Sequence, residues 1–240
     1  MKAGIITFPG SNCDRDMQYV LENFFQAQVS MLWHREAVTE NFDLIVVPGG
    51  FSYGDYLRAG AIARVAPAMQ SLVEHVKRGG AALGICNGFQ ILCEAGLLPG
   101  ALIRNQSLKH ICKDVELDWN PANPFAADLA ANGAGRRYRI PVSHSDGNYR
   151  VDPDVLKEMQ DREQIAFRYV ENPNGSIESI AGVSDSGGRV LGMMPHPERA
   201  TDPLTTTLDP AIGGDASADA AHTDGHAILK SLLARCAAAV

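Results

Sequence analysis

The sequence predicts an α/β protein in which a mostly parallel, twisted sheet carries helices on both faces. Short apolar runs alternate with amphipathic stretches through the N-terminal half, which is the order that builds a parallel sheet from strand–helix units. The runs are apolar throughout, as expected of strands buried on both sides. The chain has 240 residues, 45% of them hydrophobic, and no sharp internal boundary. We therefore expect one domain over residues 1–240.

The N-terminal half contains the elements of such a sheet in order. Buried strands are expected at 4–8, 29–33, 44–47 and 81–85. Apolar residues at helical spacing predict a helix through residues 17–25, with Asn12 as its candidate cap. A second helix is expected over 61–77, ending at Gly79-Gly80, and a third over 87–95.

The C-terminal half has a different character. Strands are expected at 115–119, 139–142, 164–170, 177–183 and 190–194. Several are joined by Gly, Asn and Asp turns, which predicts antiparallel additions to the sheet. Residues 205–225 are rich in Ala, Asp, Gly and Thr, and we predict a mobile surface loop there. Ile228, Leu229, Leu232 and Leu233 predict a closing helix.

The charge balance, the lengths of the apolar runs and the cysteine count exclude several classes of function. Lys plus Arg number 21 and Asp plus Glu 28, which gives a net charge of -7 and argues against broad binding of nucleic acid. No apolar run approaches the roughly 18 residues of a membrane span. The five cysteines are odd in number and scattered, without a CxxC pair. This pattern predicts neither a disulfide framework nor a zinc site, and it favours a reducing cytoplasm.

The most informative segment is Gly84-Ile85-Cys86-Asn87-Gly88, between a predicted buried strand and a helix. In a nucleophile elbow the turn is tight, so small residues must flank the nucleophile. A cysteine at a helix N-terminus is activated, because the helix dipole stabilises the thiolate. The simpler interpretation, a small buried hydrophobe, is retained for Cys13, Cys93, Cys112 and Cys236, which lack such flanks.

A thiolate nucleophile needs a base that can also protonate a leaving amine. His196 follows a predicted strand and lies between two prolines, and Glu198 is two residues further on. In an extended segment both side chains would point to one side, so Glu198 could orient the imidazole. The alternative is a solvated histidine and a surface carboxylate. A metal site would require further ligands at suitable spacing, which the sequence does not offer, so no metal is expected.

Acyl transfer also needs donors for an oxyanion. Candidates are the backbone N–H of Asn87 and the loop containing Gly49 and Gly50, which ends a predicted parallel strand. Gln90 lies four residues after the cysteine, on the same helix face, and could touch substrate. Ser143 and His144 also follow a strand and could bind a polar ligand. A polar hairpin explains those two equally well.

Together these residues carry a family resemblance. The segments 84–90 and 195–199 resemble the class I (triad) glutamine amidotransferases, and the match extends to segments 8–14 and 48–58. The resemblance implies a flavodoxin-like fold, with Cys86 as nucleophile and His196 and Glu198 completing the triad. It also implies an oxyanion hole at Gly49, Gly50 and Asn87, and glutamine contacts from Gln90 and His144.

The resemblance is closest to glutaminase subunits that hydrolyse L-glutamine and pass ammonia to a large synthetase subunit. That subunit is expected to use ATP and Mg to convert formylglycinamide ribonucleotide to formylglycinamidine ribonucleotide in purine synthesis, and a small third subunit is expected to bridge the two. No cofactor is expected on this chain. Two departures stand out: Ser145-Asp146-Gly147 replaces the family's Gly-Glu-Gly, and 208–223 resembles an insertion.

Two other functions fit parts of the sequence. Cysteine peptidases and deglycase-like hydrolases share the elbow but usually carry a histidine directly after the nucleophile, where this chain has Asn87. A non-catalytic binding module would lack the nucleophile or the base, and this sequence has both. The sequence therefore favours the glutaminase.

Overall fold

The computed structural model describes residues 1–126, 129, 135–206 and 223–237. Its main feature is a nine-stranded sheet in the order β2-β1-β3-β4-β11-β10-β9-β6-β7. A separate two-stranded sheet pairs β5 (Ala101–Ile103) with β8 (Asn148–Arg150). The α/β fold class predicted from the sequence is confirmed.

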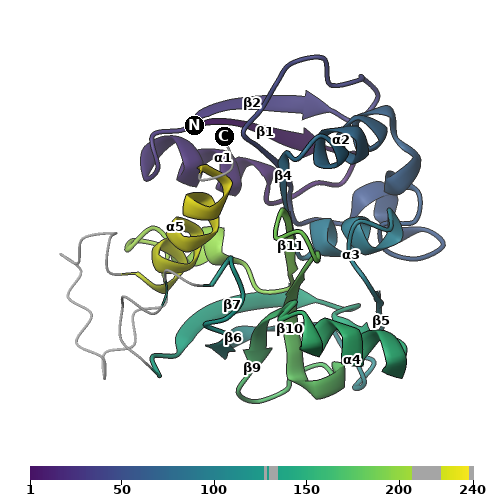
Figure 1. Ribbon diagram of the computed structural model, residues 1–240, viewed down its shortest axis with the longest axis vertical. Coiled ribbons are helices and arrows are strands. Elements are labelled where there is room, and N and C mark those ends of the chain that lie inside the picture. Colours follow the sequence, from purple (N-terminus) through teal and green to yellow (C-terminus); the bar gives the residue numbers. More distant parts are fainter. Residues whose placement is uncertain (127–128, 130–134, 207–222, 238–240) are drawn as a thin grey trace.

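The first five strands of that order are parallel. They are β2 (Gln28–Trp33), β1 (Lys2–Thr7), β3 (Leu44–Val47), β4 (Ala81–Ile85) and β11 (Val190–Met193). Every residue of β3, β4 and β11 is buried, because helices cover both sides of the sheet. Helices α1 (Asp14–Asn23) and α5 (Asp224–Ala237) lie on one side of it, and α2 (Pro67–Lys77) and α3 (Asn87–Glu94) on the other (Figure 1).

The remaining four strands of the large sheet are antiparallel additions, as predicted. They are β10 (Ile180–Ser184), β9 (Ile165–Tyr169), β6 (Ile111–Trp119) and β7 (Tyr138–His144). Helix α5 packs on β7 and on η5 (Pro197–Ala200), the short 3₁₀ helix that follows β11. The C-terminal helix thereby supports the segment that follows the central strand.

Several predicted boundaries differ from the structure, and three of the differences are local. The helix expected over 61–77 begins at Pro67, because the residue before a proline disfavours the helical region and Ala66 is extended (ψ 145°); residues 63–65 form the 3₁₀ helix η2. The cap of α1 is Cys13 rather than Asn12. The strand expected over 177–183 starts at Ile180, since a kinked 3₁₀ helix, η4, occupies Ile177–Ser179.

Three elements were not predicted. Strands β5 and β8 have three residues each, too few to show a period. Helix α4 (Pro153–Asp161) was missed although its start has a recognisable sequence pattern: the Asp152 side chain accepts a hydrogen bond from the N–H of Asp154, and Pro153 occupies the first turn. Most of the predicted mobile loop at 205–225, residues 207–222, lies outside the described residues. No described helix is long and apolar enough to cross a membrane.

Candidate active site

Neighbouring parallel strands bring distant parts of the chain together at one edge of the sheet. Strands β3, β4 and β11 are adjacent in the sheet, and the chain leaves their carboxyl ends at Gly49, Cys86 and His196. This is the edge at which open α/β sheets bind ligands. The sheet order therefore gathers the nucleophile, the base and the glycine loop that the sequence singled out.

Cys86 forms the strained turn of a nucleophile elbow. It caps α3 with φ 51° and ψ −105°, a conformation that side-chain-bearing residues rarely adopt. A Cβ on Gly88 would overlap the Val47 carbonyl, and one on Gly84 would lie 2.7 Å from the Gly88 oxygen. Both flanking glycines are therefore required by packing. The elbow predicted from the sequence is present, and it places Cys86 at the N-terminus of α3.

His196 and Glu198 form a buried hydrogen-bonded pair. The distance from His196 Nδ1 to Glu198 Oε1 is 2.7 Å, and the two side chains are 3% and 0% exposed. The backbone N–H of His196 donates to the Pro141 carbonyl at 2.9 Å, which anchors the histidine on β7. The predicted pairing is present, but the segment is not extended: the turn of η5 carries Glu198 back onto its own histidine.

The electrostatics of this pair favour a charged imidazole. Burial alone would lower the pKa of His196, but the Glu198 carboxylate and the Cys86 sulfur outweigh it, and the pKa of His196 is raised well above its ordinary value. The Cys86 sulfur contributes to this shift in the pKa of His196, so the thiol and the imidazole interact electrostatically. The imidazole and the carboxylate are hydrogen-bonded to each other, and the Cys86 thiol follows the neighbouring strand, so the groups that a cysteine nucleophile and its base require are gathered in one place.

The glycine loop after β3 packs directly against the histidine. A Cβ on Gly49 would lie 2.7 Å from His196 Cε1. Gly50 has φ +155°, and a Cβ there would approach the Ser11 backbone to 2.8 Å. The loop can therefore hold its N–H groups beside the reacting centre only because both residues lack side chains. Its position is suited to an oxyanion hole shared with the N–H of Asn87.

The side chains of Asn87 and Gln90 are engaged within the protein. Asn87 Oδ1 accepts from Ser52 N at 3.1 Å and from Ser52 Oγ at 2.5 Å, while Asn87 Nδ2 donates to Gln90 Oε1 at 2.9 Å and to Asp55 Oδ1 at 3.3 Å. Gln90 Nε2 donates to the Asp146 carbonyl at 2.6 Å. These side chains join α3 to the segment that contains Ser52 and Asp55 on one side and to the turn that contains Asp146 on the other. A direct contact from Gln90 to a ligand stays a prediction.

Ser143 and His144 lie at the end of β7. The Ser143 carbonyl accepts a hydrogen bond from Cys86 Sγ at 3.6 Å. His144 is 2% exposed and its Nδ1 lies 3.1 Å from Asn105 Oδ1. Burial, with the neighbouring His196, lowers the pKa of His144 to about 4, so its imidazole is neutral at pH 7. The Ser143 carbonyl lies beside the thiol and His144 interacts with His196, and a role of either residue in binding a polar ligand stays a prediction.

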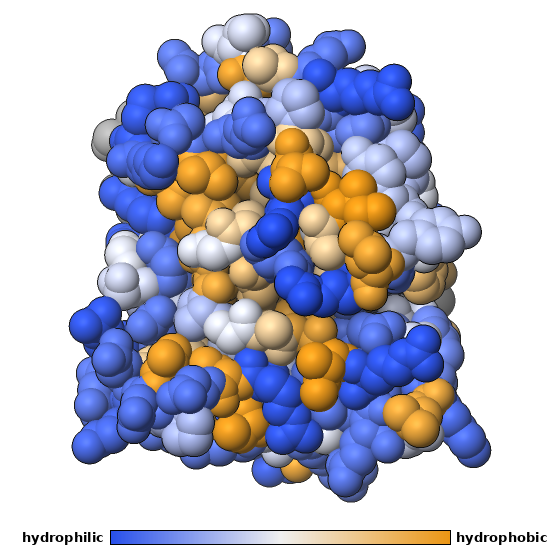
Figure 2. Space-filling view, turned by 90° about the vertical axis from the view of Figure 1, so that its right-hand side faces the viewer, coloured by the Kyte–Doolittle hydropathy of each residue, from blue (hydrophilic) through white to orange (hydrophobic). Residues whose placement is uncertain are grey.

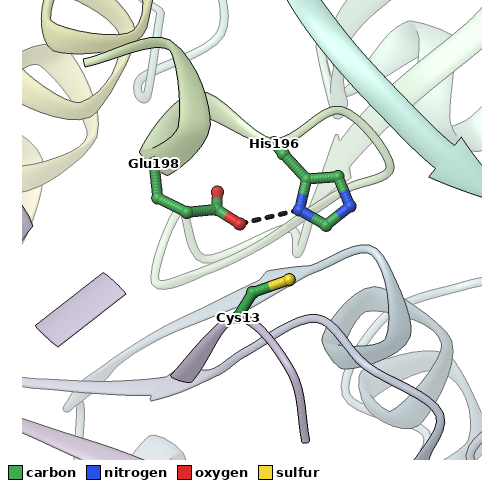
Figure 3. A group of neighbouring side chains, drawn as sticks. All are labelled: Cys13, His196 and Glu198. Atoms are coloured by element: carbon green, nitrogen blue, oxygen red, sulfur yellow. Dashed lines mark hydrogen bonds and ion pairs between the residues drawn. The ribbon is translucent and has the colours of Figure 1, made fainter. Parts of the chain in front are cut away.

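Sequence reasoning missed a second thiol at this site. Cys13 follows β1, which neighbours β3 in the sheet, and its sulfur points toward the His196–Glu198 pair (Figure 3). Arg199 Nη2 donates to Cys13 Sγ at 3.2 Å. Its burial fits the interpretation as a small hydrophobe, but the thiol lies beside Arg199 and the His196–Glu198 pair. The only sequence signal was its place in the segment 8–14.

A doubly covered parallel sheet with a cysteine elbow and a buried His–Glu pair at its carboxyl edge is the arrangement of the triad glutamine amidotransferases. The chain belongs to the CobB/CobQ-like glutamine amidotransferase domain family, whose model matches residues 1–221.

Individual relatives agree with this family. A phosphoribosylformylglycinamidine synthase subunit PurQ from Leptospira interrogans is 52% identical over 211 residues, covering 87% of this chain and 95% of the relative. One from Synechococcus sp. (strain CC9605) is 48% identical over 236 residues, covering 97% and 100%. Among solved structures, PurLQS from Thermotoga maritima matches with a TM-score of 0.80 at 39% identity, covering 97% of both chains. A glutamine amidotransferase from the same organism, 18% identical with a TM-score of 0.64 over 98% and 97% of the two chains, supports the fold.

Proposed function

We propose that this chain is the glutaminase subunit of phosphoribosylformylglycinamidine synthase. It hydrolyses L-glutamine to glutamate and ammonia and passes the ammonia to a synthetase subunit for the ATP-dependent conversion of formylglycinamide ribonucleotide to formylglycinamidine ribonucleotide. The observation that carries the proposal is the convergence of Cys86, His196 and Glu198 at one sheet edge, in a chain that is 52% identical to a PurQ subunit.

The first half of the reaction forms a thioester. The Cys86 thiolate attacks the side-chain amide carbon of glutamine, and the N–H groups of Gly50 and Asn87 stabilise the resulting oxyanion. The His196 imidazolium, held by Glu198, gives its proton to the leaving nitrogen. The C–N bond breaks, ammonia leaves, and a γ-glutamyl thioester remains on Cys86.

The second half releases glutamate. His196 is now neutral and takes a proton from a water molecule that attacks the thioester carbon. The C–S bond breaks, glutamate leaves and the thiolate–imidazolium pair is restored. Glu198 fixes the ring orientation in both halves, because its bond to Nδ1 leaves the other ring nitrogen for proton transfer.

Ammonia transfer requires a partner, because ammonia released into neutral water becomes ammonium, which is no nucleophile. The relative from Thermotoga maritima carries the name PurLQS, which supports a synthetase subunit and a small third subunit as partners of this chain. We assign ATP and Mg to the synthetase and no cofactor to this chain. The cytoplasm, expected from cysteine usage, fits the free cysteines found among the described residues.

Exposed apolar side chains near the site suit such a partner. Tyr56, Leu57 and Val65 follow the glycine loop and are 74%, 91% and 62% exposed. η2, which contains Val65, packs against α2 and α3. The face that carries these helices shows apolar groups set among charged ones (Figure 2), a mixture typical of protein interfaces.

The test is ammonia release from glutamine by the wild-type chain, Cys86→Ala and His196→Ala, each with and without the synthetase subunit. We expect both variants to lose activity by about 10³-fold or more. Cys93→Ala removes a second buried cysteine of α3, and it should retain activity. Equal activity in Cys86→Ala and wild type would refute the proposal, and so would the absence of glutamine-dependent amidine formation by the assembled complex.

A further inference from the structure

The thiol of Cys13 completes a cluster of metal-ligating atoms at the catalytic pair. Cys13, His196 and Glu198 each offer one ligand atom, and these atoms all lie within 4.8 Å of one another. All three residues are buried, at 3%, 2% and 3% exposed. Figure 3 shows the sulfur directed at the two side chains from the opposite segment.

Two polar atoms of this cluster lack partners. His196 Nε2 and Glu198 Oε2 are buried and form no hydrogen bond of standard geometry with any described residue. Buried polar atoms are normally satisfied, because leaving one without a partner costs about 1–3 kcal/mol. Because Glu198 is bonded to Nδ1, Nε2 faces away from the carboxylate, and one cation cannot engage both of these atoms. Glu198 Oε2 is the unpartnered atom that a cation bound beside Nδ1 would satisfy.

We propose that Cys13, His196 and Glu198 form an inhibitory site for a thiophilic divalent cation of the Zn²⁺ type. A thiolate, an imidazole and a carboxylate are the ligands that Zn²⁺ prefers. Ligands around tetrahedral zinc are about 3.3–3.6 Å apart, given bond lengths of about 2.0–2.3 Å. His196 would bind the cation through Nδ1, so its 2.7 Å hydrogen bond to Glu198 Oε1 would open by about 0.6–0.9 Å while the Cys13 thiol moves inward, and water would take the fourth position.

Arg199 influences this site in two directions. Burial raises the pKa of the Cys13 thiol, and the guanidinium, 3.2 Å from Cys13 Sγ, partly offsets this by favouring the thiolate that a metal requires. The same charge opposes a cation. However, the Arg199 side chain is 39% exposed and also pairs with Asp16 at 3.3 Å, so it can move toward solvent without losing its carboxylate partner.

Metal binding would stop the proposed reaction. An imidazole and a carboxylate that hold a cation cannot hold and transfer a proton, so both halves of the hydrolysis lose their acid–base group. Inhibition should be reversed by a chelator. The inhibition rests on the proposed function, whereas binding of the cation does not.

Binding is tested in the Cys86→Ala background, which removes the nucleophile and every metal site that depends on it. Isothermal titration with Zn²⁺ should show one tight site per chain. Adding Cys13→Ser should weaken binding at least tenfold, whereas adding Cys112→Ser, which removes an exposed thiol, should leave it unchanged. Co²⁺ should give a thiolate charge-transfer band that disappears only with Cys13→Ser.

Two results would overturn the proposal: no tight site in Cys86→Ala, or equal affinity after Cys13→Ser. Circular dichroism of each variant establishes that it is folded. The cobalt charge-transfer band reports the Cys13 thiolate in the Cys86→Ala protein without any further substitution. Zn²⁺ inhibition of glutaminase should also weaken at least tenfold in Cys13→Ser, scored against that variant's own metal-free rate. Binding without inhibition would contradict the inhibitory role while leaving the glutaminase assignment unaffected.

Discussion

Replacing Glu198 by Gln tests the electrostatic role of the carboxylate, because the two side chains have nearly the same shape. The carboxylate is fully buried and lies 2.7 Å from His196 Nδ1. A hydrogen bond to a charged group contributes about 1.5–3 kcal/mol. Opposite charges about 4 Å apart at an effective dielectric of about 20 interact by about 4 kcal/mol. These bounds predict a loss of about 10- to 1000-fold in kcat.

The pH profile distinguishes this effect from a structural one. Glu198 raises the pKa of His196, so the protonated imidazole persists below that raised pKa and is lost as pH rises through it. In Glu198→Gln the pKa of His196 falls, and the alkaline limb of the kcat profile should move to lower pH. The exposed control Glu74→Gln should change neither quantity. An unmoved alkaline limb together with a loss below tenfold would refute the reasoning.

Two further predictions concern the elbow and the loop beside it. In Gly88→Ala the added Cβ would overlap the Val47 carbonyl, so urea unfolding should show a free energy of unfolding lower by about 3 kcal/mol. In the control Gly96→Ala the added Cβ has nothing within 4 Å but φ is +71°, so the free energy of unfolding should fall by about 1 kcal/mol. Equal losses in the two variants would contradict the packing argument. Burial and then Asp146 raise the pKa of Asp55 to about 6, so its ionisation opposes folding as pH rises through 6. After allowance for partial exposure, Asp55→Asn should stabilise the protein by about 1–2 kcal/mol at pH 7 and by almost nothing at pH 4; a gain that is the same at both pH values would contradict this account.

The candidate catalytic groups could be picked out from the sequence because their signals are local. The elbow needs a glycine on each side of Cys86, and His196 and Glu198 are two residues apart, so each signal fits within a few positions. The prediction of an extended segment around Glu198 was wrong in detail, since a short helix starting at Pro197 makes the turn. The pairing was correct because two residues bring side chains together in either geometry.

The position of Cys13 could not be predicted, because it depends on sheet order rather than on local sequence. Strand β1 lies beside β3, and β4 lies between β3 and β11. Those long-range pairings bring Cys13 within hydrogen-bonding distance of Arg199, which is 186 positions away in the sequence. The same limit applies to Gln90, whose partner across the site is the Asp146 carbonyl on a turn between two late strands.

The most direct test of the account is to trap the acyl-enzyme. Wild-type protein mixed with glutamine and quenched in acid should carry a γ-glutamyl group, and peptide mapping should locate it on Cys86. His196→Ala should accumulate less adduct, and Cys86→Ala none. A glutamyl adduct on another residue, or glutaminase turnover in Cys86→Ala at the wild-type rate, would contradict the assignment of this sulfur as the nucleophile.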